Sequence, residues 1–237
     1  MPPSLSVPGL FNARDLGDYP TRDGQLTRRR SLVRADDLAQ LTDAGLRALA
    51  DYGIETVVDL RWPEEAARNP SPVPQGLPGV RFAHISLLTH TEDEWRLRSR
   101  DVAKELWKCT VLERVRLELR RVLVVIANAS PGGLLFHCVA GKDRTGLIAA
   151  LLLALADVEP RYIASDYAVS AQNLREEYLK RYAESEPARV LEALRCPEQG
   201  AYNMLKFLEN AGGVRTYLSD LGLTEEQIRA LRARLRS

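Results

Sequence analysis

One segment in the second half of the chain constrains the fold more than any other. Leu134-Leu135-Phe136-His137 is a short apolar run typical of a buried strand, and an apolar helix is expected over Thr145–Ala156. The chain between them is a tight loop that contains Gly141. A strand that passes through a short loop directly into a helix is a building unit of α/β proteins. The segment therefore predicts a sheet covered by helices.

The same loop carries Cys138 and Arg144 with five residues between them, enough chain to encircle one phosphate group. The backbone N–H groups of a tight turn and the N-terminus of the following helix together attract an anion. Their partial positive charge also stabilises a thiolate, the nucleophilic form of cysteine. An arginine can hold two phosphate oxygens at once, which a lysine cannot. The loop therefore indicates attack by Cys138 on a phosphate ester.

Helices and strands alternate through the first two thirds of the chain. We expect helices over residues 42–52 and 94–128, strands over 54–60 and 80–87, and a proline-rich loop over 69–79. From residue 160 onward every pattern is helical, including a capping box that begins at Thr224. We therefore expect a single domain over residues 1–237. It should have a central mixed or parallel sheet flanked by helices, with an all-helical part over about residues 160–237.

Charge and composition exclude several classes of function. Lys and Arg number 33 against 32 Asp and Glu, so no overall field favours nucleic acid. The three cysteines show neither disulfide nor zinc spacing, and Cys109 and Cys196 are interpreted as small core residues. The three histidines show no metal-ligand spacing either, so no metal or other cofactor is expected.

The apolar stretches do not suggest a membrane protein. The N-terminal residues lack the basic and apolar regions of a secretory signal. The longest apolar run, Leu147–Ala156, is too short to span a bilayer. We therefore expect a cytoplasmic protein without stable membrane insertion.

Residues 137–146, HCVAGKDRTG, resemble the signature loop of the protein tyrosine phosphatase superfamily, and the Lys-Asp pair within them resembles its atypical bacterial branch. Further blocks resemble the same branch: residues 12–17 (NARDLG), 30–36 (RSLVRAD), 58–61 (VDLR) with Glu65, and 212–215 (GGVR). The chain departs from the branch at Asp18, where glycine is common. The resemblance extends from about residue 10 to residue 235. It implies the cysteine-phosphatase fold.

The resemblance also implies a role for each residue of the loop. Cys138 would form a phosphocysteine intermediate, and Arg144 would hold the transition state. His137 would orient the loop and help to stabilise the thiolate. Thr145 would offer its hydroxyl to the sulfur as the intermediate breaks down, although it could equally be a helix cap.

The rest of the loop would bind the phosphate. Val139, Ala140 and Gly141 would contribute backbone groups, and Lys142 would add a second cation inside the cradle. The alternative for Lys142 is an ordinary solvated loop residue.

Three carboxylates are candidates for the general acid that protonates the leaving group. Asp143 is the first choice, because the resembling branch carries Asp at this position of the loop. Asp59 is the second, since it lies at the carboxyl end of a predicted strand; its alternative is a salt bridge with an arginine. Asp93 is a distant third. Trp62-Pro63-Glu64 superficially resembles a mobile acid loop, but it lies within the VDLR segment and is not equated with one.

Several functions compete. The leading hypothesis is a phosphatase for protein phosphotyrosine, with phosphoserine and phosphothreonine as further substrates. A phosphoinositide phosphatase is the alternative, favoured by Lys142 but opposed by Val139, where such enzymes commonly have a second lysine. A rhodanese-type sulfurtransferase and an inactive phosphate-binding module fit less well. A helical segment, either residues 91–108 or 171–195, is expected to gate the site, although the second could be ordinary core.

Overall fold

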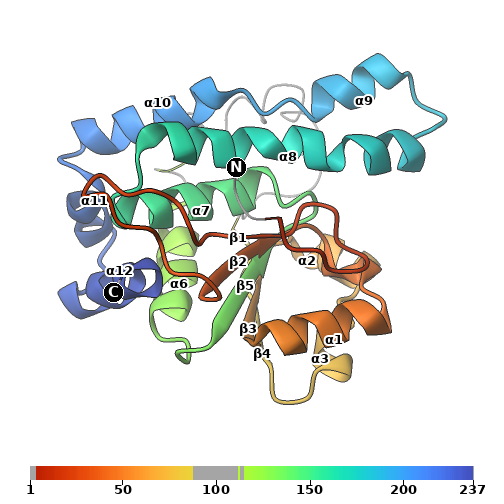
Figure 1. Ribbon diagram of the computed structural model, residues 1–237, viewed down its shortest axis with the longest axis horizontal. Coiled ribbons are helices and arrows are strands. Elements are labelled where there is room, and N and C mark those ends of the chain that lie inside the picture. Colours follow the sequence, from red (N-terminus) through yellow and green to blue (C-terminus); the bar gives the residue numbers. More distant parts are fainter. Residues whose placement is uncertain (1–3, 88–111, 113–114, 237) are drawn as a thin grey trace.

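The computed structural model describes residues 4–87, 112 and 115–236. Its centre is a five-stranded sheet in the order β1-β2-β5-β3-β4 (Figure 1). β1 runs antiparallel to β2, and the other neighbouring strands are parallel. The strands are β1 (Arg14–Asp15), β2 (Leu32–Ala35), β3 (Ile54–Asp59), β4 (Arg81–His84) and β5 (Gly133–His137). The predicted mixed sheet with flanking helices is confirmed.

β5 lies in the middle of the sheet and is buried on both faces. Leu134 and Phe136 belong to one apolar cluster, while Leu135 between them belongs to a second cluster. Neighbouring β2 repeats this alternation with Leu32 and Val33. Successive side chains of a strand point to opposite faces, so a strand covered on both sides needs a continuous apolar run. The loop that follows β5 therefore starts from a rigid support.

α1 (Asp43–Tyr52) covers the face that carries the second cluster, to which it contributes Leu46 and Leu49. The Thr42 hydroxyl caps its N-terminus, and Gly53 ends it with a φ of 90°, a backbone conformation that favours glycine. The predicted helix over 42–52 and the strand that follows it are confirmed.

Three short helices were not predicted, and the last of them lies within the predicted loop over 69–79. They are a 3-10 helix at Leu38–Gln40, α2 (Pro63–Arg68) and α3 (Val73–Gly76). α2 and α3 each have proline in the first turn, where a missing N–H breaks no helical hydrogen bond. Proline content alone therefore wrongly predicted an entirely irregular segment over 69–79.

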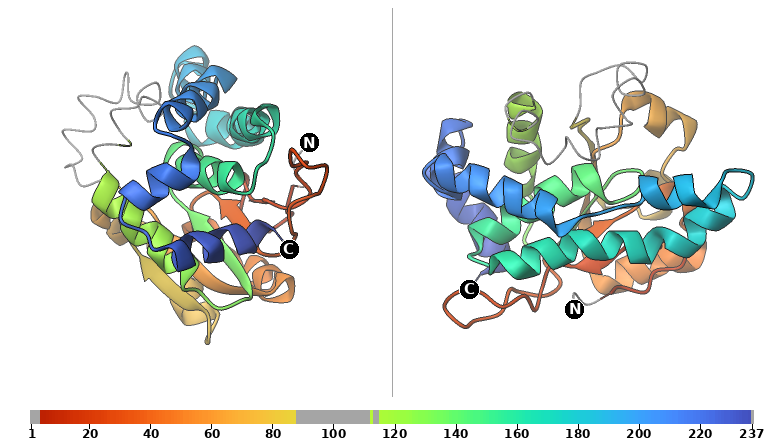
Figure 2. Two further views of the ribbon diagram at one scale, coloured as in Figure 1. Left: turned by 90° about the vertical axis from the view of Figure 1, so that its left-hand side faces the viewer. Right: turned by 90° about the horizontal axis from the view of Figure 1, so that it is seen from above.

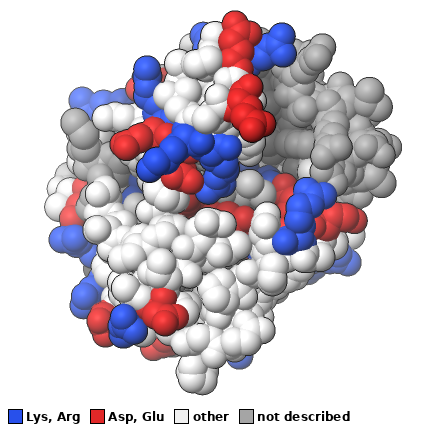
Figure 3. Space-filling view, turned by 90° about the vertical axis from the view of Figure 1, so that its right-hand side faces the viewer, with Lys and Arg blue, Asp and Glu red and all other residues white. Residues whose placement is uncertain are grey.

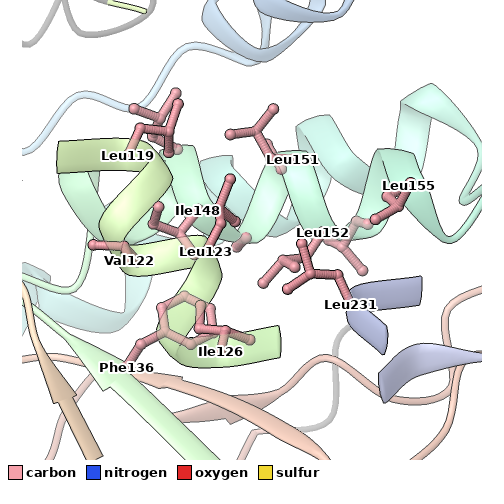
Figure 4. Packing of buried hydrophobic residues seen from close by; sticks show 14 of the residues in the cluster. Leu119, Val122, Leu123, Ile126, Phe136, Ile148, Leu151, Leu152, Leu155 and Leu231 are labelled. Carbon is pink, nitrogen blue, oxygen red and sulfur yellow. The ribbon is translucent and has the colours of Figure 1, made fainter. Parts of the chain in front are cut away.

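The larger apolar cluster fills the space between the sheet and three helices: α6 (Arg116–Ala127), α7 (Asp143–Leu155) and α12 (Glu225–Leu235). Figure 4 shows Ile148 and Leu152 of α7 close to Leu123 of α6 and Leu231 of α12. Almost every residue of α7 is buried, which explains its lack of a polar face. α7 begins two residues before the predicted Thr145, so Asp143 and Arg144 belong to its first turn.

The C-terminal part is helical, as predicted. It consists of α8 (Pro160–Arg181), α9 (Pro187–Ala193), α10 (Glu198–Asn210), α11 (Val214–Asp220) and α12. α10 runs along the outer side of α8, and α9 lies beside the C-terminal end of α8 (Figure 2). Thr224 and Gln227 form the predicted capping box of α12. In the described part of the chain, no helix combines the length and the apolar character that crossing a membrane requires.

Candidate active site

Cys138 lies at the carboxyl end of β5, where a loop leads into the first turn of α7. We call residues 138–144 the anion loop. The Cys138 thiol is free and only 2% exposed. Gly141 turns the loop with a φ of 60°, and a Cβ at this position would lie 2.4 Å from the carbonyl oxygen of Ala35. Only glycine fits there, and the loop therefore packs directly against the end of β2.

The carbonyl oxygens of the anion loop are held from outside by two buried side chains. Asn12 donates its side-chain amide to the carbonyls of Ala140 (2.9 Å) and Gly141 (3.2 Å). The Arg34 guanidinium donates to the carbonyls of Gly141 (2.7 Å) and Lys142 (3.2 Å). These bonds fix the orientation of the peptide groups in the middle of the loop.

The N–H groups of the loop consequently point to its interior. The Asp37 N–H donates to the Val139 carbonyl at 3.0 Å, so every carbonyl over residues 139–142 accepts a hydrogen bond. The N–H groups over the same residues have no partner within the described part of the chain. Successive inward N–H groups form a concave site for an anion, and the N-terminus of α7 adds to it. The geometry thus agrees with a phosphate cradle at Cys138.

Arg144 is a buried cation at the end of the anion loop. Its guanidinium donates to both carboxylate oxygens of Glu65, at 2.6 and 2.9 Å, and lies over the Trp62 ring at 5.2 Å. Burial opposes its charge, but the nearby Cys138 thiolate and Glu65 outweigh burial and raise the pKa of Arg144. Glu65 also accepts the backbone N–H of Trp62 at 2.8 Å. Trp62 and Glu65 therefore position Arg144, whereas the sequence had suggested no role for them beyond a motif.

Lys142 is not the solvated loop residue that was weighed as its alternative role. Its side chain is buried, and its ammonium donates to the Ala193 carbonyl of α9 at 2.8 Å. The Asp143 carboxylate lies 3.5 Å from the same ammonium. Lys142 therefore ties the anion loop to α9.

Asp143, the first candidate for the general acid, lies in the first turn of α7 beside the anion loop. Its carboxylate accepts the Tyr167 hydroxyl at 2.9 Å and is partly exposed. Asp143 is thus a partly exposed carboxyl directly before Arg144, and its role as the general acid stays a prediction.

Asp59, the second candidate, is engaged in the ion pair that was weighed as its alternative. Arg61 donates to both of its oxygens, at 2.7 to 3.1 Å, and Asp59 is 1% exposed. Burial alone would raise the pKa of Asp59, but His137 and Arg61 outweigh it and hold that pKa below its usual value. The carboxylate is poorly placed to release a proton. Asp93 lies outside the described residues.

His137 and Thr145 flank the anion loop on its buried side. Burial lowers the pKa of His137 to about 4, so its imidazole is neutral near pH 7. Its Nε2 lies 3.6 Å from the Asp59 carboxylate. His137 therefore brings no positive charge to the thiolate near neutral pH. The buried Thr145 hydroxyl has no hydrogen-bond partner in the described part of the chain, as a group held ready for a reacting atom should.

Comparison with known proteins agrees with this geometry. The model of a tyrosine phosphatase family matches residues 5–237. The chain belongs to the tyrosine phosphatase family. A tyrosine-protein phosphatase of Nostoc commune is 31% identical over 227 residues, which cover 86% of this chain and 74% of the relative. The triple specificity protein phosphatase PtpB of Mycobacterium tuberculosis is 30% identical over 190 residues, which cover 68% of this chain and 67% of PtpB.

A solved structure is also similar to part of the chain. The crystal structure of P. aeruginosa TpbA aligns with 71% of this chain at 17% identity and a TM-score of 0.33, which is too low to inform the site. Membership of the tyrosine phosphatase family makes this protein a cysteine-dependent phosphatase and removes the rhodanese alternative.

The anion loop is held by buried residues to which the sequence analysis assigned no role. We call them the rear network; they are Asn12, Arg14, Tyr19, Arg34, Asp166 and Ser170. The Asp166 carboxylate accepts from Arg14 at 2.8 Å, from Tyr19 at 2.8 Å and from Arg34. Arg14 in turn donates to the Asn12 side-chain oxygen at 2.6 Å. The network therefore fixes both side chains that hold the loop carbonyls.

Two buried guanidinium groups stabilise the charge of the Asp166 carboxylate. Burial would raise the pKa of Asp166, but Arg14 and Arg34 outweigh it and lower that pKa to about 2. The sequence signal that could have pointed to Asn12, Arg14 and Arg34 is their place in the blocks that resemble the family. Asp166 had none, because a single Asp in a long helix is usually a surface residue.

A second residue that the sequence did not single out is Asp36, which follows β2. Its carboxylate accepts the N–H groups of Phe11 and Asn12 and is buried, and burial raises its pKa to about 6.

Asp18, where the family often has glycine, has a φ of 61°. That backbone conformation favours glycine, which explains the family preference.

Three remaining expectations concern cysteines, metals and gating. Cys196 is buried and donates to the Leu194 carbonyl, as expected of a core residue, while Cys109 lies outside the described residues. Within the described part of the chain, no group of three potential ligands could hold a metal ion. Of the gating candidates, residues 91–108 are not described. The segment 171–195 packs against Ala140 of the loop, and its opening stays a prediction.

Proposed function

We propose that this protein hydrolyses phosphotyrosine in proteins through a phosphocysteine at Cys138. The observation that carries the proposal is the anion loop, in which every carbonyl over residues 139–142 accepts a hydrogen bond and the N–H groups of these residues have no partner in the described part of the chain. Such fixed donors stabilise the charge of a transferring phosphoryl group without reorganisation.

In the first step the Cys138 thiolate attacks phosphorus, a sulfur–phosphorus bond forms, and the bond from phosphorus to the tyrosine oxygen breaks. The inward N–H groups and Arg144 hold the equatorial phosphate oxygens. Asp143 gives its proton to the leaving phenolate, which departs as neutral tyrosine.

In the second step water attacks the phosphocysteine. Asp143, now a carboxylate, accepts a proton from that water as the oxygen–phosphorus bond forms. The sulfur–phosphorus bond breaks, and the buried Thr145 hydroxyl donates a hydrogen bond to the departing thiolate. Inorganic phosphate leaves and the enzyme returns to its starting state.

Two observations favour phosphotyrosine over the other substrate classes. Cys138 is only 2% exposed, so a long tyrosine side chain can reach it more easily than the shorter side chains of phosphoserine and phosphothreonine. Lys142, the cation that could meet an extra phosphate of a phosphoinositide, is bound to the Ala193 carbonyl. The relative PtpB is a triple specificity phosphatase by name; for this chain we propose a narrower preference.

The test is a side-by-side measurement of kcat/KM on a phosphotyrosine peptide, a phosphoserine peptide of the same sequence and a soluble phosphoinositide. We expect the phosphotyrosine peptide to be preferred, and Cys138→Ser to lose activity on all three. A phosphoinositide rate above the peptide rate would contradict the proposed preference. Activity that survives in Cys138→Ser would contradict the nucleophile.

A further inference from the structure

A groove of about 540 Å³ opens between the C-terminal end of α8 and α9. We call it the α8–α9 groove. Tyr178, Tyr182, Val190 and Ala193 form its walls, and Glu184 and Glu186 stand among the residues of its rim. None of these residues has a role in the chemistry proposed above.

The α8–α9 groove lies beside the anion loop. Lys142 of the loop donates to the carbonyl of Ala193, a wall residue of the groove, at 2.8 Å. Ala140 of the loop packs against the same small apolar cluster as Val190 and Tyr178. A Cys138 thiolate is also among the charges that act on the Tyr178 hydroxyl. A peptide held at Cys138 would therefore have the groove next to it.

The walls of the groove are suited to an apolar side chain. The rings of Tyr178 and Tyr182 lie 5.6 Å apart at an angle of 53°, and Val190 and Ala193 add aliphatic surface. Tyr182 is 47% exposed, so much of its ring is free to be covered. Covering such aromatic and aliphatic surface is favourable in proportion to the area removed from water.

Around the groove, one carboxylate has no ion-pair partner among the described residues. Arg189 pairs with Glu186 at 3.3 Å, and Arg181 pairs with Glu177 at 3.1 Å. Glu184 forms no ion pair with any residue that the structure describes. Figure 3 looks onto this end of the molecule and shows acidic and basic side chains together there. The rim is thus slightly acidic and complementary to a basic residue.

We propose that the α8–α9 groove is a specificity subsite for an apolar side chain near the phosphotyrosine of a substrate peptide, with Lys or Arg preferred beside it. The inference rests on the proposed function. Each extended residue spans about 3.3–3.6 Å, so side chains two or three positions from the phosphotyrosine reach roughly 7–10 Å from it. That range is suited to a groove whose residues touch the anion loop.

The test uses phosphotyrosine peptides that carry Leu or Gly at each of three positions on either side of the phosphotyrosine. The readout is the ratio of kcat/KM for the Leu peptide to that for the matched Gly peptide, taken within each protein. We expect a ratio of about ten at one position in the wild type, and a ratio near one in Tyr182→Ala. The control Leu26→Ala changes an exposed apolar residue that pairs with Pro20, away from the groove, and should keep the wild-type ratio.

The charged rim is tested with Arg and Glu at the neighbouring positions. Glu184→Lys should turn a severalfold preference for Arg into a preference for Glu, and salt should weaken both preferences. The control Glu226→Lys, on α12, should retain the preference for Arg. Ratios near one at every position in the wild type would overturn the subsite, as would an unchanged ratio in Tyr182→Ala. If the proposed function itself failed, the wild type would hydrolyse p-nitrophenyl phosphate but no phosphotyrosine peptide.

Discussion

The two sides of the anion loop are built differently. On the rear side, Asn12 and Arg34 hold the loop carbonyls, and two buried arginines share the Asp166 carboxylate. On the front side, Lys142, Asp143 and Arg144 are bound to Ala193, Tyr167 and Glu65 respectively. The front carboxylates are partly exposed, whereas the rear network is closed to solvent.

The difference separates what must stay fixed from what must respond to substrate. The rear network holds the N–H groups in place before any phosphate arrives, which is the condition for electrostatic stabilisation without reorganisation. On the front side, a guanidinium has five N–H donors, and Glu65 uses one donor from each of two nitrogens. Arg144 therefore keeps further donors for phosphate while Glu65 sets its orientation.

The largest effect is expected at Asp143 on the front side. If Asp143 protonates the leaving group, Asp143→Asn should slow hydrolysis of an ester with a poor leaving group by roughly 10²–10⁴-fold. An ester with a very acidic leaving group should lose much less, because its phenolate departs without a proton. Rates on the two esters, measured across pH, check this.

Asp59→Asn is the matched comparison, since Asp59 was the second candidate acid. It should not distinguish the two leaving groups, because the carboxylate is buried against Arg61. An Asp143→Asn variant that slows both esters equally would make Asp143 a structural residue of the loop.

On the rear side, Asp166→Asn should cost about 3–5 kcal/mol in the free energy of unfolding. The change leaves Arg14 and Arg34 buried without their shared counter-charge, and uncompensated buried charge is strongly destabilising. Denaturant unfolding measures it. The control Glu225→Gln breaks an exposed pair with Arg215 and should cost less than about 1 kcal/mol. Equal costs in the two variants would show that the rear network contributes no special stability.

A smaller effect is expected at Glu65, which positions Arg144. Glu65→Gln should lower kcat/KM by roughly 10–100-fold, the scale of a misplaced binding group. Because Arg144 acts on the phosphate, the loss of activity should be the same for good and poor leaving groups, unlike the loss in Asp143→Asn. Glu64→Gln, one residue away in the same helical turn, serves as the control and should have little effect.

The sequence predicted the backbone of the anion loop better than the side-chain contacts around it. Strand β5, the tight turn at Gly141 and helix α7 all follow from local patterns, because apolar periodicity and glycine report on nearby backbone. The pairing of Arg34 with the loop joins residues 107 positions apart in the chain. No local pattern carries that information, since a buried arginine and a solvated one look alike in a sequence.

The same limit explains the interpretation of Lys142. Its charge suggested either the cradle or solvent, but the ammonium lies against the Ala193 carbonyl, 51 positions further along the chain. Long side chains choose their partners from tertiary structure. Glu65 was visible only within a block that resembles the family, and its role required the three-dimensional contact with Arg144.

The smallest effect concerns two buried groups next to the loop whose titrations oppose each other. Burial lowers the pKa of His137 from 6.5 to about 4, so between these pH values the unfolded chain binds a proton that the folded protein does not. His137 therefore contributes stability above pH 6.5 that is lost as pH falls toward 4. Burial raises the pKa of Asp36 from 3.8 to about 6. Ionised Asp36 therefore lowers stability above pH 6, and this penalty disappears as pH falls.

The wild-type stability should consequently change little between pH 7 and pH 5.5, because the two contributions, each about 1 kcal/mol, have opposite signs. His137→Gln removes the loss of stability that comes from His137, so on acidification the free energy of unfolding of that variant should rise by about 1 kcal/mol relative to the wild type. Asp36→Asn removes the gain that comes from Asp36, so its free energy of unfolding should fall by a similar amount relative to the wild type. Denaturant unfolding at both pH values measures the change within each protein, which cancels the fixed cost of each substitution. Shifts of the same sign in both variants would show that one of the two groups does not titrate as its burial requires.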